Sequence, residues 1–282
     1  MIKYWGFFSS AVVSAAVIAL VIFLGVSAAS GISVPLFFGD TKPFDAVFKG
    51  ALVWNGLWAP ILGTLRLLVL TGAFAVPMGL AVGIYASEYA KGKWERRITA
   101  VLESLAGMPS IIVGLFGFVL ILFLRSYFFP ANTSILLASF CLAVLVLPTL
   151  SLNTYAALKG LPESIRLTAA SLGLRREAAI FMILIPSAAE GIFSGLLLSA
   201  ARCAEDTAVI LMTGAVAGTG NVTGIFDKFE ALPFFIYYTS ANYQDEAQLV
   251  QVFAAVFLLL VITSLFFASG TVLKNRSRLW TR

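Results

Sequence analysis

The chain has 282 residues, of which 60% are hydrophobic and 12% are charged, and its formal net charge is +5. A soluble domain usually carries about 25% charged residues, so this composition excludes a soluble protein and predicts an all-α integral membrane protein. Histidine is absent, which removes the commonest general base and metal ligand and argues against an enzyme.

Six stretches are long and apolar enough to cross a bilayer, which takes about 20 residues each. The first begins after a lysine and ends in small residues, as a signal peptide does. Its apolar run is longer than the usual 15 residues or so, which favours an uncleaved span. We place the six spans at residues 7–29, 57–86, 99–124, 133–155, 187–216 and 249–272.

This division predicts three parts: an N-terminal transmembrane helix with an external loop (1–56), one packed transmembrane bundle (57–272) and a basic tail (273–282). Thirteen of the 19 lysines and arginines lie at the two termini and in the loops after the second and fourth spans. The positive-inside rule therefore places both termini and these loops in the cytoplasm. The basic residues thus indicate how the chain is oriented in the lipid membrane, and they do not indicate a nucleic-acid-binding surface.

The second and third spans contain residues that are unusual at membrane depth. Arg66 either balances an acid of the fifth span or extends its head group to the interface. The third span contains AGMPSIIVGLFG, with three glycines and a proline. This pattern predicts either tight helix packing or a break in a helix that lines a pathway.

The loop after the fourth span, residues 156–178, contains two short predicted helices. The first begins at Pro162 with Glu163 in its first turn and ends at Gly173, which suits a left-handed cap. The second runs from Arg175 until Pro186 marks the entrance to the fifth span. We expect an ordered cytoplasmic protrusion. Its seat, the apolar side chains that pack it against the spans, would consist of Ile165, Leu172 and Leu174. Its rim, the exposed basic edge, would consist of Arg166, Arg175 and Arg176.

The spacing in this loop resembles the signature of ABC importer permeases. Gly173 is followed by nine residues, Ile183, one residue, Ile185 and Pro186, as in the family, while Leu167–Ala169 replaces its Glu-Ala-Ala triplet. The resemblance implies that the loop docks an ATPase subunit. The residues expected to couple to it are Glu163, Arg166, Ala169, Ala170, Gly173, Leu174, Arg175 and Pro186.

Three longer segments resemble, in the correct order, the PstA-type phosphate permeases: ESLAGMPSIIVGLFGF, LPESIRLTAASLGLRREAA and ARCAEDTAVILMTGAVAG. The resemblance covers about 57–272 and implies a MetI-like type I ABC importer fold. It also implies a second, PstC-like permease, two PstB-like ATPase subunits and an external, PstS-like phosphate-binding protein. The chain has no GxxxxGK[ST] loop, so we expect it to bind no cofactor, with ATP and Mg used by the ATPase subunits.

The fifth span contains an arginine and two acids. Positions three and four apart share a helix face, so we expect Arg202 to lie beside both Glu205 and Asp206. Such a cluster cannot face lipid, and it either locks two spans together as an ion pair or lines the pathway of a charged substrate. An arginine suits phosphate because its planar fork pairs two oxygens at once.

PstA-like permeases usually read R-A-I-G-E-T at this point. Arg202 and Thr207 match the arginine and threonine, Asp206 takes the glutamate position and Glu205 replaces the glycine. The resemblance therefore implies that these four residues line the substrate pathway.

The last external loop, residues 222–248, is rich in aromatic residues and net acidic. Its tyrosines and phenylalanines are typical either of a membrane interface or of a surface that docks an external partner.

The sequence thus predicts the permease subunit of an ATP-driven importer that moves inorganic phosphate by alternating access and has no catalytic site of its own. Three alternatives remain. The chain could be a permease for molybdate, tungstate or sulfate, or an ion-coupled carrier working alone, although such carriers usually show two-fold repeats. A membrane enzyme acting on lipid or phosphate esters would need a catalytic set that the sequence lacks.

Overall fold

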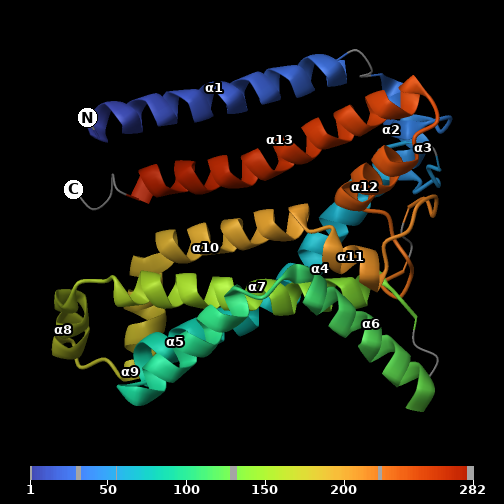
Figure 1. Cartoon of the computed structure of the whole chain (residues 1–282). Helices are drawn as coiled ribbons and strands as arrows, with labels where there is room; N and C mark the ends of the chain where they lie inside the picture. Colours follow the sequence, from blue (N-terminus) through green and yellow to red (C-terminus); the bar gives the residue numbers. More distant parts are fainter. Residues whose placement is uncertain (1, 30–32, 55, 128–131, 222–223, 278–282) are drawn as a thin grey trace. The chain divides into compact units, whose positions relative to one another are not determined.

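The computed structural model describes residues 2–29, 33–54, 56–127, 132–221 and 224–277, and the regular elements of these residues are all helices (Figure 1). They form two compact units. Unit 1 consists of Met1–Thr64, Val216–Thr223 and Phe229–Ile262, and unit 2 of Leu65–Ala215, Gly224–Lys228 and Thr263–Arg282.

Unit 1 is built around two long helices that run side by side, α1 and α13 (Figure 1). The rings of Phe23 and Phe253 meet edge to face, with centroids 5.8 Å apart. Unit 1 contains α1 (Ile2–Ala29), α2 (Val34–Phe38), α3 (Pro43–Phe48), the start of α4 (Trp58–Ile84), α12 (Leu232–Asn242) and most of α13 (Glu246–Ser277).

Unit 2 is organised around α7, whose side chains are largely buried. Small residues bring α10 against it: a Cβ at Gly191 would lie 2.6 Å from the Ala157 Cβ, and one at Gly195 2.5 Å from the Asn153 Cβ. Helices in membranes approach closely through such small residues. Besides the rest of α4, unit 2 contains η1 (Tyr85–Tyr89, a π-helix), α5 (Lys93–Ala106), α6 (Ser110–Tyr127), α7 (Ile135–Lys159), α8 (Glu163–Ser171), α9 (Arg176–Ala179), η2 (Ile180–Leu184, a π-helix), α10 (Ile185–Glu205) and α11 (Ala208–Thr213).

Six segments of the described residues are long and apolar enough to cross a membrane, which confirms the predicted number of spans. They are Tyr4–Ala29, Trp58–Tyr89, Ser110–Tyr127, Ile135–Lys159, Arg176–Glu205 and Glu246–Ser269.

The bounds of the third span differ from the prediction. The helix expected from residue 99 is interrupted after Ala106, and the apolar segment begins at Ser110. Pro109 explains the interruption, because its ring disfavours helical backbone in the residue before it. The preceding helix α5 instead carries the basic residues of the loop on its first turns.

The fifth span begins and ends earlier than expected. Pro186 does not end a helix, because the chain runs from Arg176 through η2 into α10, with the proline in the first turn of α10. The wider π turn accommodates a residue that lacks an N–H and whose ring crowds the carbonyl four residues before it. At the other end the span stops at Glu205.

The predicted basic tail at 273–282 lies partly within α13, which continues to Ser277. Residues 278–282 lie outside the described residues.

Candidate coupling and pathway sites

The helix–glycine–helix arrangement predicted for the loop after the fourth span is present in unit 2. Helix α8 follows Pro162 and begins at Glu163, and Gly173 takes a left-handed φ of +66° just after it. The amide of Gly173 donates to the Ala170 carbonyl at 3.0 Å. Glycine adopts this conformation without steric cost and so ends the helix sharply.

Arg166 holds this loop to the spans instead of lying on its rim, so the rim prediction was wrong for this residue. Its Nη2 lies 2.9 Å from Glu88 Oε1 and donates to the Leu158 carbonyl at 2.9 Å, while its Nη1 donates to the Leu161 carbonyl at 3.2 Å. The last carbonyls of α7 have no partner within the helix, and a guanidinium carries five donors in a fixed fork. Its hydrogen bonds therefore fix the start of α8 to both α7 and η1.

Two further contacts support the same region. The guanidinium of Arg176 lies 4.4 Å from the centre of the Tyr89 ring, a cation–π geometry. The Lys159 ammonium lies 2.7 Å from Glu95 Oε1, which also accepts a hydrogen bond from the Tyr155 hydroxyl at 2.7 Å. These hydrogen bonds, the one from Lys159 first, lower the pKa of Glu95 below its usual 4.5. The loop is thus tied to α5 as well as to η1.

The outer face of the loop carries exposed leucines. Leu167 is 62% exposed and Leu172 is 67% exposed. Leu172 therefore does not pack the loop against the spans, and the prediction was wrong for this residue. The seat consists of Ile165 and Leu161 against Leu158, Ile180 and Leu184.

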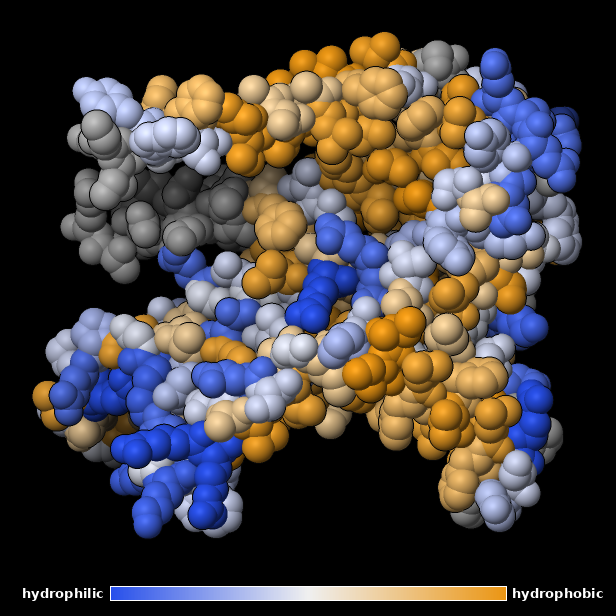
Figure 2. Space-filling view, in the orientation of Figure 1, coloured by the Kyte–Doolittle hydropathy of each residue, from blue (hydrophilic) through white to orange (hydrophobic). Residues whose placement is uncertain are grey.

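The remaining residues predicted to couple divide between these two faces. Ala169 is buried and Leu174 half-buried, whereas exposed positions are taken by Glu163, Ala170, Gly173, Arg175 and Pro186. Figure 2 shows hydrophilic residues gathered at the end of unit 2 that is formed by α8, α9 and the start of α5.

The fifth span ends in a helix break at its charged residues. Helix α10 stops at Glu205, and Asp206 has an extended backbone with ψ of 116°. Its Oδ1 accepts a hydrogen bond from the Val209 amide at 2.8 Å. Asp206 thus satisfies the first turn of α11, the role for which aspartate is preferred at helix starts.

Arg202 and Glu205 both lie in α10, whereas Asp206 is the residue at which the helix ends, and the expected contact of Arg202 with the two acids is not formed. Arg202 is half-buried and Glu205 exposed. In the part of the chain that the structure describes, no carboxylate oxygen lies within 4.0 Å of an Arg202 nitrogen. Among the described residues Arg202 therefore forms no ion pair of the kind that would lock two spans together.

The glycines of the third span serve packing. A Cβ at Gly114 would lie 3.0 Å from the Ala208 carbonyl oxygen, and one at Gly117 would lie 2.8 Å from the Thr213 side chain. Both residues let α6 approach α11, the short helix after the break. Of the two interpretations of this stretch, tight packing applies to these glycines and a break applies to Gly107–Pro109.

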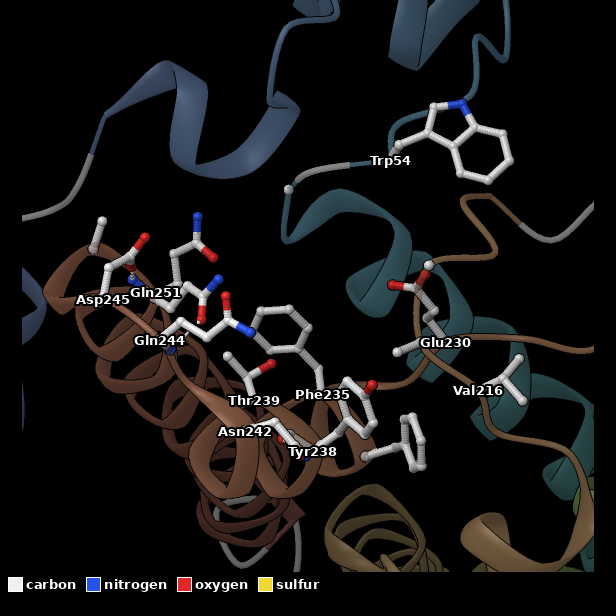
Figure 3. A pocket seen from close by; sticks show the side chains of 16 residues that line it. Trp54, Val216, Glu230, Phe235, Tyr238, Thr239, Asn242, Gln244, Asp245 and Gln251 are labelled. Atoms are coloured by element: carbon white, nitrogen blue, oxygen red, sulfur yellow. Dashed lines mark hydrogen bonds between the residues drawn. The ribbon is translucent and has the colours of Figure 1, made fainter.

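Unit 1 contains a cavity of about 670 Å³ that sequence reasoning did not anticipate (Figure 3). Its wall includes Glu230, which is 5% exposed and accepts hydrogen bonds from the amides of Thr219 at 2.7 Å and Gly220 at 3.3 Å. Burial raises the pKa of this carboxyl, and the hydrogen bonds from these amides oppose the increase. The available signal was a single acid within the apolar run FEALPFF, preceded by the glycine-rich AGTG.

Comparison with known proteins identifies a family and several relatives. Residues 75–279 match the family model described as "Binding-protein-dependent transport system inner membrane component". The phosphate transport system permease protein PstA of Mycobacterium leprae is 31% identical over 211 residues, covering 74% of this chain and 67% of that protein. PstA of Pasteurella multocida is 29% identical over 216 residues, covering 76% of this chain and 75% of that protein.

Solved structures of ABC transporters have a similar fold. An inward-facing structure of the MetNI methionine ABC transporter matches with a TM-score of 0.58 at 19% identity, covering 77% of this chain and 95% of that one. An amino acid ABC transporter matches with a TM-score of 0.53 at 18% identity, covering 76% and 90%. At these identities the similarity concerns the fold alone, and it agrees with the MetI-like bundle predicted from the sequence.

Proposed function

The chain belongs to the family of binding-protein-dependent transport system inner membrane components, and we propose that it is the permease subunit of an ATP-driven importer of inorganic phosphate. The observation that carries the proposal is its similarity to permeases named for phosphate transport over about three quarters of its length. It is a multi-pass membrane subunit, and the ATPase activity belongs to partner subunits.

The proposed partners follow from the family. They are a second, PstC-like permease, two PstB-like ATPases that use ATP and Mg, and a PstS-like binding protein outside. The positive-inside distribution supports cytoplasmic termini and a cytoplasmic position for α8. No cofactor is assigned to the chain itself.

The anchored loop supports a route for mechanical coupling. An ATPase subunit would contact the exposed face of α8 with Leu167 and Leu172. Arg166 would transmit its movement to α7 and η1, because its guanidinium is bonded to both. From Arg176 to Glu205 the chain is helical, so a shift at the loop would reach the break at Asp206 without an intervening flexible segment.

The break supports a pathway role for Arg202. A guanidinium without a local carboxylate partner is available to pair two oxygens of a phosphate. The aspartate that replaces glutamate in the PstA pattern caps α11, so its shorter side chain has a structural explanation and does not require another oxyanion. In this mechanism, motion of α10 against α11 would expose Arg202 alternately to either side of the membrane. Thr207 at the break would contribute a hydroxyl, and Glu205 would set the local charge.

Transport by the reconstituted complex tests this function. The chain and its partner subunits are purified together and placed in liposomes with ATP, and uptake of radiolabelled phosphate is measured with the cognate binding protein present. Phosphate should enter only with ATP, and excess molybdate, tungstate or sulfate should not compete. Preferential uptake of one of those anions, or phosphate uptake by the chain alone without ATP, would overturn the proposal.

A further inference from the structure

The cavity in unit 1 has two facing walls of different chemistry. One is formed by the end of α12 and the start of α13, with Thr239, Asn242, Gln244 and Gln251 (Figure 3). Trp54 lies on the other side, and Glu230 also lines the cavity, with its Oε1 bonded to the amides of Thr219 and Gly220. The cavity is therefore a polar hollow with aromatic faces.

Its charge is negative. Two lining residues are acids, Glu230 and Asp245, and no lysine or arginine is among the described residues that line it. A phosphate dianion would be repelled by this lining, so the cavity is unsuited to the proposed substrate. It is suited to a cation, and the exposed rings of Trp54 and Tyr238 provide faces over which a cation is attracted.

Two side-chain hydrogen bonds that cap the start of α13 fix the rim of the cavity. Asp245 Oδ1 accepts from the Gln248 amide at 2.8 Å, and Gln248 Oε1 accepts from the Gln244 amide at 2.9 Å. These two bonds hold the backbone of Gln244 while its exposed side chain lines the cavity. The hollow is thus preorganised by hydrogen bonds that do not involve the Gln244 side-chain amide.

Size and donor set indicate which cation fits. A bare metal ion is disfavoured, because the described residues contain no group of three or more His, Cys, Asp or Glu side chains arranged to hold one. The cavity volume of about 670 Å³ lies within the range of roughly 300–1,000 Å³ that is typical of ligand sites. It is large enough for a long side chain of another protein and the residues next to it. Amide oxygens, carboxylates and aromatic faces together match a guanidinium or ammonium group.

We infer that this cavity receives an arginine or lysine side chain of the external binding protein when that protein docks on the permease. The inference rests on the proposed function, because it takes the segment 216–248 to face the outside and a binding protein to deliver the substrate. Charge complementarity selects this occupant: the cavity supplies the negative partner and the aromatic wall, and the docking protein supplies the cation.

The test measures ATP hydrolysis by the reconstituted complex as the concentration of phosphate-loaded binding protein is raised. Gln244→Lys adds a positive charge at the rim without removing a hydrogen bond of the cap. Ala241→Lys adds the same charge at an exposed position one residue before the lining residue Asn242, outside the cavity. Gln244→Lys should raise the half-saturating concentration of binding protein about tenfold and leave the maximal rate unchanged, while Ala241→Lys should change neither more than about twofold.

Equal effects of the two lysine variants, or a change in maximal rate alone, would overturn the inference. So would saturable stimulation or inhibition of wild type by agmatine, a free guanidinium compound, combined with unchanged binding-protein dependence in Gln244→Lys. That pattern would identify a small-molecule site. A wild-type complex that does not respond to any binding protein would contradict the proposed function itself, which distinguishes the two failures.

Discussion

The loop at 156–178 is net basic and the segment at 216–248 is net acidic, and their charged side chains bind different kinds of partner. In the first, Arg166 is bonded to a carboxylate and to the end of a helix, and the outward face carries exposed leucines. In the second, the Glu230 carboxylate accepts a hydrogen bond from the Thr219 backbone amide, and Glu230 and Asp245 line the cavity. Side-chain bonds between helices make the first suited to transmitting movement. The second has a preformed cavity suited to receiving a partner.

The largest expected effect is on stability, from a substitution that disturbs the packing of α4 against the acidic segment. A Cβ at Gly63 would lie 1.8 Å from the Glu230 carbonyl oxygen, so Gly63→Ala must displace backbone. We expect it to lower the free energy of unfolding by roughly 2–3 kcal/mol, measured as the midpoint of thermal unfolding in detergent.

Gly72→Ala on the same helix is the matched control. A Cβ there meets nothing within 4 Å, so the better helix propensity of alanine should stabilise by up to about 1 kcal/mol. Equal midpoints for the two variants would show that the close approach at Gly63 does not support the acidic segment.

The second effect separates anchoring from mere charge in the basic loop. Arg166→Ala removes the bonds to Glu88 and to the end of α7, and leaves the carboxylate of Glu88 without its cation. Phosphate uptake per ATP hydrolysed should fall about tenfold, the factor that corresponds to losing about 1.4 kcal/mol of coupling. Lys91→Ala removes an equal charge from an exposed position of the other basic loop, outside the predicted coupling residues, and should change the ratio less than about twofold. A loss as large in Lys91→Ala would favour charge over anchoring.

A third effect concerns the break that the loop is proposed to move. Asp206→Ala removes the acceptor for the Val209 amide and should destabilise by about 1 kcal/mol. Asp206→Asn keeps an acceptor at the same place and should remain close to wild type in the thermal midpoint. Comparable losses in both variants would assign the residue's contribution to its charge and not to capping.

The smallest effect is a pH dependence in the basic loop. The lowered pKa of Glu95 means that its contact with Lys159 contributes stability above pH 4.5 and loses it as the pH falls through the folded pKa. Glu95→Gln should therefore reduce the slope of the thermal midpoint against pH below about 4.5, with a cost at neutral pH of a few tenths of a kcal/mol. An unchanged slope would show that the contact is not maintained in solution.

Sequence patterns predicted the features that hydrophobicity and backbone chemistry determine locally. Apolar length identified six spans, and Pro162 with Gly173 located α8 to within a residue or two, because both residues restrict or release φ at fixed positions. These features require no knowledge of what lies across the fold.

The features that were missed depend on partners distant in the chain. Nothing in the loop distinguishes Arg166, which meets Glu88 78 residues away, from its exposed neighbour Arg175. The break at Asp206 was hidden because the following AVILM is apolar enough to continue the span, while capping depends on local backbone geometry. To recognise the role of Glu230, one would have to know that the amides of residues ten and eleven positions earlier converge on its carboxylate.

The most direct test of the central claim is phosphate uptake by the complex carrying Arg202→Ala. Assembly with the partner subunits and ATP hydrolysis are measured in the same liposomes. If the break in the fifth span is where the anion passes, uptake should be abolished while assembly and ATP hydrolysis persist. Uptake at the wild-type rate in Arg202→Ala would contradict a pathway role for this residue and return it to a structural one.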